Sequence, residues 1–394
     1  MRTYQELFRA PEFAPFFLTW SVQTAAQTVA GPALAALVYS ATGSPLLSSL
    51  AMFGPALAQV VGAATLLSAA DRLPPRAAMS GLALVLGAGT AVQAVPGLPV
   101  WAVFAVLLCF GLVTAAGRGT TFGLLTDILA RQDFLLGRSV LSMSVGVVQI
   151  CGFAIGGVLV QQVSARGTLL VAAGLYVAAA GIARFGLRPR APRAVGRPSV
   201  ARTWRNNAAL WSARPRRYVY LALWVPNGLI VGCESLFVPY APAHSGLLLA
   251  CAAFGMLVGD TLTGRFLPGH WRARLGSPLR LLLAVPYLVF ALRPTLWLAL
   301  VAVTLASVGY SASLLLQDRL MALTPDDMSG HALGLHSSGL LTLQGVGAGL
   351  AGAVAGWTSP ATAMAVLAAG SIAVTLALAP GLRTPLPARE LATV

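Results

Sequence analysis

The sequence contains no lysine and few acids: it has 11 Asp and Glu residues among 394, and all 26 basic residues are arginine. Charged residues make up 9% of the chain, whereas a soluble globular domain carries about 25%. Hydrophobic residues reach 57% and the mean hydropathy is +0.79. These values exclude an ordinary soluble protein and predict a polytopic membrane protein in contact with a lipid bilayer.

The net charge of +15 does not indicate a nucleic acid partner. The arginines lie between the apolar segments, not in a patch with stacking aromatic side chains. Cysteine is scarce as well. The four thiols lie inside apolar segments without metal-ligand spacing, and we interpret them as small packing residues: Cys109, Cys151, Cys233 and Cys251.

Catalytic and nucleotide-binding motifs are also absent. The chain has no G-x-x-x-x-G-K-[ST], no H-E-x-x-H and no G-x-S-x-G. The segment His336-Ser337-Ser338 does not indicate a hydrolase, because adjacent residues on a helix point in different directions. The sequence therefore predicts neither an enzyme nor a directly ATP-driven pump, and it indicates no cofactor.

Twelve apolar runs approach the roughly 20 residues that a membrane-spanning helix requires. The ninth is the weakest, because Pro286 interrupts it. The runs cover residues 15–40, 46–70, 77–95, 100–122, 139–163, 167–187, 217–240, 244–264, 279–293, 295–316, 331–356 and 360–380. The sequence predicts an all-α membrane protein with twelve transmembrane helices.

The arginines orient these helices. With the N-terminus inside, nearly all of them fall on the cytoplasmic side, including Arg72, Arg76 and those of residues 265–280. Only Arg166 and Arg293 fall outside. Because cytoplasmic loops carry an excess of basic residues, this distribution predicts a multi-pass protein of the cell membrane with both termini in the cytoplasm.

The longest polar stretch divides the chain near its midpoint. Trp204 and Trp211 lie there among arginines, which indicates either an amphipathic helix on the anionic inner leaflet or a solvated basic loop. We predict a six-helix bundle in residues 1–187, a basic cytoplasmic linker in 188–216 and a second six-helix bundle in 217–394.

The two bundles share a weak internal repeat. The fifth and eleventh runs align at four positions, which pair Ser142 with Ser337, Gln149 with Gln344, Gly152 with Gly347 and Gly157 with Gly352. The first run also contains Trp20-x-x-Gln23 and the seventh contains Trp224-x-x-Asn227. Matches in the same order in both halves predict two pseudo-symmetric repeats of the same orientation.

The loop after the second run carries a partial motif, Asp-Arg-Leu-Pro-Pro-Arg at residues 71–76. With twelve helices, a 6+6 repeat and a basic central loop, the chain resembles the major facilitator superfamily. The family signature in this loop is a Gly, three residues, Asp-Arg, one residue, then Gly and two basic residues. Asp71, Arg72 and Arg76 match it, whereas Leu67 and two prolines replace the other positions.

The resemblance implies gating roles for several residues. Asp71 would accept hydrogen bonds from the unpaired N–H groups that begin the eleventh helix and so hold the outward-open state, or it would form a simple charge pair at a helix end. Asp260 ends the eighth run in the corresponding place. Family exporters carry G-x-x-x-G-P-x-x-G-G in the fifth helix; Gly152, Gly156 and Gly157 fit this pattern, which favours export.

The resemblance also implies that helices 1, 4, 7 and 10 line a central cavity. The candidate proton- or substrate-binding residues on them are Gln23, Gln27, Arg118, Trp224, Asn227, Glu234 and Tyr310. Taken singly, most such side chains are structural hydrogen-bonding groups. Trp224, Asn227 and Glu234 nevertheless share one helical stripe beside Pro226, which favours a functional role.

Glu234 is the only acid on these stripes. An isolated ionised carboxylate is costly at membrane depth, so we interpret Glu234 as a group that binds and releases a proton. Recognition of a cationic substrate, or a structural acid that is protonated or paired with arginine, are the alternatives. Arg118 is either a substrate or gating residue or an arginine that reaches the inner headgroups.

Together these features predict a monomeric secondary transporter that works by alternating access. It would export a small organic molecule, such as a drug or secondary metabolite, in exchange for protons, so a proton gradient takes the place of a cofactor. An uptake carrier or facilitator and a transport-inactive membrane sensor or assembly protein are the alternatives.

Overall fold

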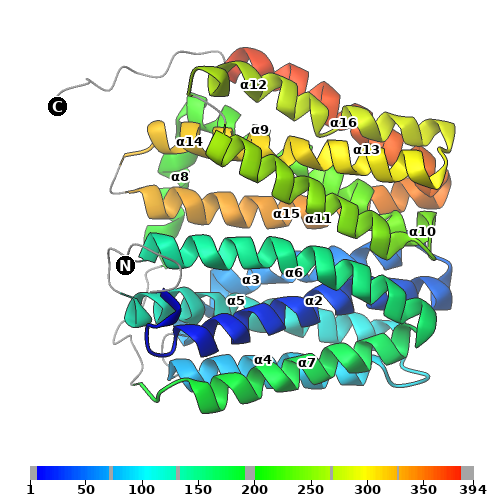
Figure 1. The fold of residues 1–394 in the computed structure, drawn as a ribbon. Helices are drawn as coiled ribbons and strands as arrows, with labels where there is room; N and C mark the ends of the chain where they lie inside the picture. Colours follow the sequence, from blue (N-terminus) through cyan, green and yellow to red (C-terminus); the bar gives the residue numbers. More distant parts are fainter. Residues whose placement is uncertain are drawn as a thin grey trace.

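The computed structural model describes residues 7–70, 74–129, 134–190, 200–266, 269–325 and 328–382. Every regular element within these ranges is a helix, and the long helices run side by side (Figure 1). The first turn of α2 (Phe13–Thr42) and the last turn of α16 (Pro360–Leu382) lie at the same end of the molecule (Figure 1). We call this the terminal end and the opposite one the far end.

Six long helices make up the first half of the chain. They are α2 (Phe13–Thr42), α3 (Pro45–Ala70), α4 (Pro75–Gln93), α5 (Val100–Ile128), α6 (Phe134–Gln162) and α7 (Ala165–Gly186). Residues that favour helix ends lie between these helices. Gly43 ends α2 at φ 63°, where its N–H donates to the Tyr39 carbonyl at 2.8 Å. Ser164 begins α7 by accepting from the Gly167 N–H at 3.2 Å.

The second half follows the same course with more interruptions. It comprises α8 (Val200–Ser212), α9 (Arg214–Ser235), α10 (Phe237–Tyr240), α11 (Ser245–Thr261), the π-helix η1 (Leu262–Phe266), α12 (Gly269–Leu282), the 3-10 helix η2 (Val285–Leu292), α13 (Leu296–Val308), the 3-10 helix η3 (Gly309–Ser311), α14 (Ala312–Ala322), α15 (Ser329–Trp357) and α16 (Pro360–Leu382). The predicted linker thus contains the helix α8.

Each of the twelve apolar runs coincides with a helical path in the structure. Within the described ranges, nine helical segments are long and apolar enough to cross a membrane by length and composition. The interruption predicted at Pro286 is present, because α12 ends at Leu282 and the chain continues as η2. The ninth span, however, begins earlier than the predicted residue 279, since its apolar segment starts at Leu275.

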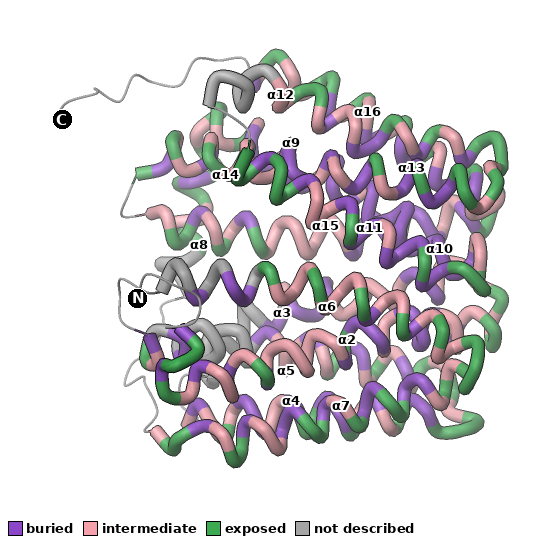
Figure 2. The backbone as a smooth tube through the Cα atoms, in the orientation of Figure 1, coloured by how far each residue is buried: buried purple, intermediate pink, exposed green. Residues whose placement is uncertain are grey.

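The outer surface is suited to lipid. Phe185 and Trp357 expose 89% and 87% of their surface. In Figure 2, buried positions follow the sides on which helices pack, and exposed positions lie on the outward sides. Large apolar side chains on the outside indicate an apolar surrounding and not water.

The two halves meet through two pairs of helices: α3 packs on α15, and α6 packs on α11. Within the first half, α2 packs on α6 and α7; within the second, α9 packs on α15 and α16. Hydrogen bonds cross the interface near the far end, where the Ser49 hydroxyl donates to the Ser235 carbonyl at 3.4 Å and the Gln161 amide donates to the Ala243 carbonyl.

Glycines of α6 and α15 show the predicted repeat in three dimensions. Gly152 packs on Thr28 of α2, and its aligned partner Gly347 packs on Gly228 of α9. Both contacts are made to the first long helix of the same half. A side chain at either position has no room, because a Cβ on Gly152 would lie 2.9 Å from Cγ2 of Thr28.

The second aligned pair faces the opposite half. Gly157 meets Gly246 of α11, and Gly352 meets Leu46 of α3. These are again the corresponding contacts of two repeats, since α3 and α11 are each the second long helix of their half. The structure therefore agrees with two six-helix bundles related by pseudo-symmetry.

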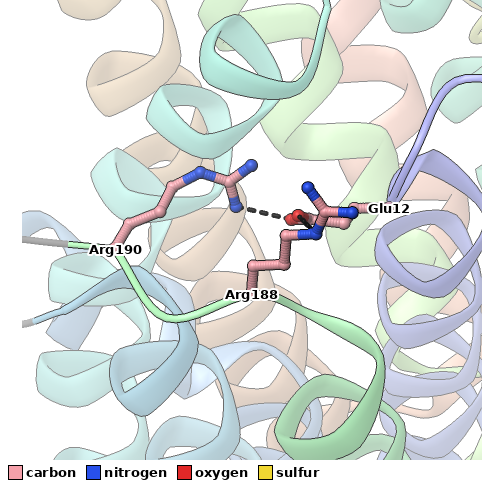
Figure 3. A network of polar contacts seen from close by, with 3 residues as sticks. All are labelled: Glu12, Arg188 and Arg190. Carbon is pink, nitrogen blue, oxygen red and sulfur yellow. Dashed lines mark hydrogen bonds and ion pairs between the residues drawn. The ribbon is translucent and has the colours of Figure 1, made fainter.

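An ion-paired acid fixes the terminal end of the first half (Figure 3). Glu12 precedes α2, and its carboxylate contacts Arg190 at 2.5 Å and Arg188 at 3.3 Å. The acid is 6% exposed, and the two arginines come directly after α7. This network joins the start of the bundle to its last helix.

Candidate functional site

The helix α9 carries the stripe predicted from the sequence. Tyr220, Trp224, Asn227, Val231 and Glu234 are all buried. The helices α14, α15 and α16 pack around α9. This stripe thus lies inside the second half, where its polar atoms require protein partners or room for a ligand.

Glu234 lies among aromatic hydroxyl groups of other helices. The Tyr310 hydroxyl of η3 lies close enough to the carboxyl group to interact with it, and Tyr287 of η2 lies within electrostatic range of the same group. Even so, Oε1 of Glu234 and the hydroxyl oxygens of both tyrosines have no hydrogen-bond partner of good geometry. The carboxyl group and the Tyr310 hydroxyl thus interact inside the protein, while Oε1 of Glu234 is left without a partner.

Asn227 lies about two helical turns before Glu234 and joins two helices. Its Oδ1 accepts a hydrogen bond from Nε2 of Gln344 on α15 at 3.2 Å. Asn227 also lines a small cavity of about 20 Å³ together with Tyr310, Arg280 of α12 and Ser313 of α14. Tyr310 therefore lines the cavity and also interacts with Glu234.

Trp224 makes contacts typical of a packing residue. Its Nε1 donates to the His336 carbonyl of α15 at 3.1 Å, and its ring stacks on Trp211 of α8 with 5.7 Å between centroids and 7° between planes. Tyr220 continues this stack and donates to the Ala332 carbonyl at 3.3 Å. The stack attaches the linker helix to the second half.

The other predicted binding residues lie in the first half, away from this cluster. Gln23 of α2 is half-buried, with its Nε2 buried and without a partner, whereas Gln27 is exposed. Arg118 belongs to the helix α5, but its side chain lies outside the described residues. The structure therefore brings together Asn227, Glu234 and Tyr310, and not the whole predicted set.

The predicted gating residues are dispersed. Asp71 and Arg72 lie outside the described residues, so their contact with α15 stays a prediction. Arg76 is half-buried in the first turn of α4, and Asp260 is exposed at the end of α11. Of the three fifth-helix glycines, Gly152 and Gly156 face α2, whereas Gly157 faces the second half.

Sequence reasoning missed Arg280. Arg280 was counted among the cytoplasmic arginines at the start of the predicted run 279–293 and was not a candidate site residue, but it lies inside the ninth span and is 6% exposed. The apolar run LLLAVP that follows directly was the available signal. Gln344 and Tyr287 were not candidates either, because only the packing of α15 and η2 brings them to α9.

Among the described residues, no group of three or more His, Cys, Asp or Glu side chains could hold a metal ion. The cluster offers one acid, three hydroxyl groups and two amides, together with one buried arginine. Such a set can exchange protons and can hydrogen-bond polar or charged organic groups.

The fold has many solved counterparts. The nucleoside transporter NupG superposes with a TM-score of 0.75 at 12% identity, with 94% of this chain and 100% of that chain covered. A transporter of the POT family in complex with a thioalcohol-conjugated peptide gives 0.71 at 12% identity, covering 94% and 96%. A bacterial homolog of the human lysosomal transporter Spinster, in an inward-facing and unoccupied conformation, gives 0.68 at 15% identity, covering 94% and 95%.

No curated protein sequence matches the chain. Residues 16–317, however, match the family model described as Major Facilitator Superfamily. This match extends over the first half and into the second as far as α14. The chain is therefore a membrane transport protein by family and fold, and it belongs to the major facilitator superfamily.

Proposed function

We propose that the protein exports a small organic molecule across the cell membrane in exchange for protons, with Glu234 as the proton-binding group. The observation that carries this proposal is the buried Glu234 carboxyl, whose Oε1 has no partner although the Tyr310 hydroxyl lies beside it. Because a buried carboxylate is costly when unpaired, its charge state depends on the groups that approach it. A carboxyl of this kind couples proton binding to substrate binding.

The interface between the halves supports alternating access. Only α3, α6, α11 and α15 provide its principal contacts among the described residues. Two bundles joined along two helix pairs can rock against each other around a site at their centre. Export as the direction rests on the glycines of α6, which fit the exporter pattern in part.

The proposed orientation in the membrane follows from the positions of the arginines. Arg188, Arg190, Arg214 and Arg217 lie at the terminal end, next to the ends of α7 and α9. An excess of arginine at one end favours a cytoplasmic location for that end, and we propose that both termini lie there. We further propose that the protein acts in the cell membrane as a monomer.

Export by cells tests this function. Cells that overproduce the protein are loaded with ethidium or carboxyfluorescein, a cationic and an anionic probe, and efflux is followed by fluorescence. We expect faster efflux of at least one probe than in cells with an empty vector, and loss of the difference after addition of a protonophore. Efflux that persists at the full rate without a proton gradient contradicts proton coupling.

Substitution of the acid makes the test specific. Glu234→Gln keeps the size and removes the proton-binding group, so we expect it to abolish gradient-dependent efflux. Asp127→Asn replaces an exposed acid of α5 and serves as the matched control, with efflux close to that of the original protein.

A further inference from the structure

Arg280 is a buried cation with an unused hydrogen-bond donor. Its Nε donates to the Gly276 carbonyl and its Nη2 to the Ser277 hydroxyl, both at 3.0 Å. Its Nη1 is buried and has no partner. The guanidinium is thus held in position by its own helix, α12, while one of its N–H groups stays available.

A close helix crossing brings Arg280 to the cavity. Gly309 of η3 packs directly on the α12 backbone, and a Cβ there would lie 2.7 Å from the Leu279 carbonyl oxygen. Arg280 and Tyr310, the neighbours of these two residues in sequence, line the same cavity. A position at which only glycine fits therefore sets the distance between the arginine and the tyrosine.

The cavity is small, and four polar side chains contribute to a lining that is otherwise apolar. Its polar lining is Arg280, Tyr310, Asn227 and Ser313, and none of the described acids lines it. The Tyr310 hydroxyl is also without a partner. Since about 10–15 Å³ of such space holds one water molecule, a cavity of about 20 Å³ accepts a single ion or one end of a larger molecule.

The charges around Arg280 leave its own charge uncompensated. No described carboxylate forms an ion pair with Arg280. The charged side chain that acts on it is another arginine, Arg319 of α14. A buried charge without a counter-charge is strongly unfavourable, so an anion in this cavity would relieve the cost.

We propose that Arg280, Tyr310 and Asn227 form an anion-binding subsite for the carboxylate of the transported molecule. The planar guanidinium suits a carboxylate, because its N–H groups match the two oxygens. Tyr310 contacts both this subsite and Glu234, so substrate and proton would be bound within one cluster. This assignment rests on the proposed transport function and adds that the substrate is an organic anion.

Equilibrium binding tests the subsite without any gradient. The purified protein is heated in detergent at increasing concentrations of sodium formate, the smallest carboxylate, and its unfolding midpoint is recorded. Formamide is the neutral control of similar size, and sodium chloride is the inorganic control. We expect formate to raise the midpoint saturably and the two controls to raise it little.

Three variants relate this response to the cavity. We expect Arg280→Gln to weaken the apparent formate affinity about tenfold to a hundredfold, as loss of a charged hydrogen bond implies. Tyr310→Phe weakens it less, and it serves as the second probe if Arg280→Gln does not fold. Arg265→Gln, which replaces an exposed arginine of η1, retains the response.

The outcomes separate the alternatives. An unchanged formate response in both Arg280→Gln and Tyr310→Phe, or no response in the original protein, overturns the subsite. An equal response to chloride overturns the substrate assignment and leaves an inorganic anion site. If efflux by the original protein does not depend on the proton gradient but formate still binds, the proposed function is contradicted and the subsite is not.

Discussion

Substitution of Gly157 by alanine probes the contact between the two halves. Gly157 of α6 and Gly246 of α11 meet backbone to backbone near the far end. A Cβ on Gly157 would lie 2.8 Å from the Cα of Gly246 and 3.4 Å from its nitrogen. Carbon atoms in ordinary contact are about 3.5–4.0 Å apart, so α6 and α11 must separate by roughly 1 Å, or the added methyl group is strained.

The expected magnitude follows from two opposing effects. Overpacking of this kind costs about 1–3 kcal/mol, whereas alanine in place of glycine inside a helix gains about 0.5–1 kcal/mol. The matched control is Gly174→Ala in α7, because a Cβ there meets nothing within 4 Å. We therefore expect Gly157→Ala to lower stability and Gly174→Ala to leave it unchanged or raise it.

The assay is the unfolding midpoint of each purified variant in detergent, measured as the folded fraction that survives heating. Gly157→Ala should show a lower midpoint than the original protein, and Gly174→Ala should not. The reasoning is refuted if both variants change the midpoint equally, because the close crossing of α6 and α11 would then carry no energetic consequence.

Three further changes test other contacts. Glu12→Gln removes the charge between Arg188 and Arg190, and we expect a loss of about 1–3 kcal/mol, measured as a lower unfolding midpoint that becomes less sensitive to salt. Trp211→Ala removes the ring stacked on Trp224 and should speed cleavage of α8 by trypsin at Arg205, whereas Trp204→Ala, at a residue 67% exposed, should not. Gln344→Leu leaves Oδ1 of the buried Asn227 without its partner and should cost about 1–3 kcal/mol; a midpoint equal to that of the original protein would contradict the role of this hydrogen bond.

The helical framework could be predicted from the sequence, because the bilayer imposes a length and an apolar composition that each segment shows by itself. The repeat was also accessible, since Gly152 and Gly347 occupy equivalent contacts. A close helix crossing requires glycine, so the same residue recurs at the aligned position in each half. Pro286 likewise predicted the interruption between α12 and η2.

Apart from Tyr310, which the family resemblance implied, the candidate site could be predicted only along α9. Asn227 and Glu234 share a helical face, and periodicity is sufficient to show it. Their partners come from other helices: Tyr310 from η3, Gln344 from α15 and Arg280 from α12. These contacts depend on how the helices pack, which the local pattern of a single segment does not contain.

The role of Glu234 in proton coupling is the central claim, and transport in proteoliposomes tests it most directly. The original protein and Glu234→Gln are reconstituted, and uptake of a probe identified in the efflux assay is measured with and without an imposed pH gradient. We predict that the gradient drives accumulation only in the original protein, whereas Glu234→Gln still exchanges labelled for unlabelled probe. Gradient-driven accumulation by Glu234→Gln at the original rate would contradict the claim.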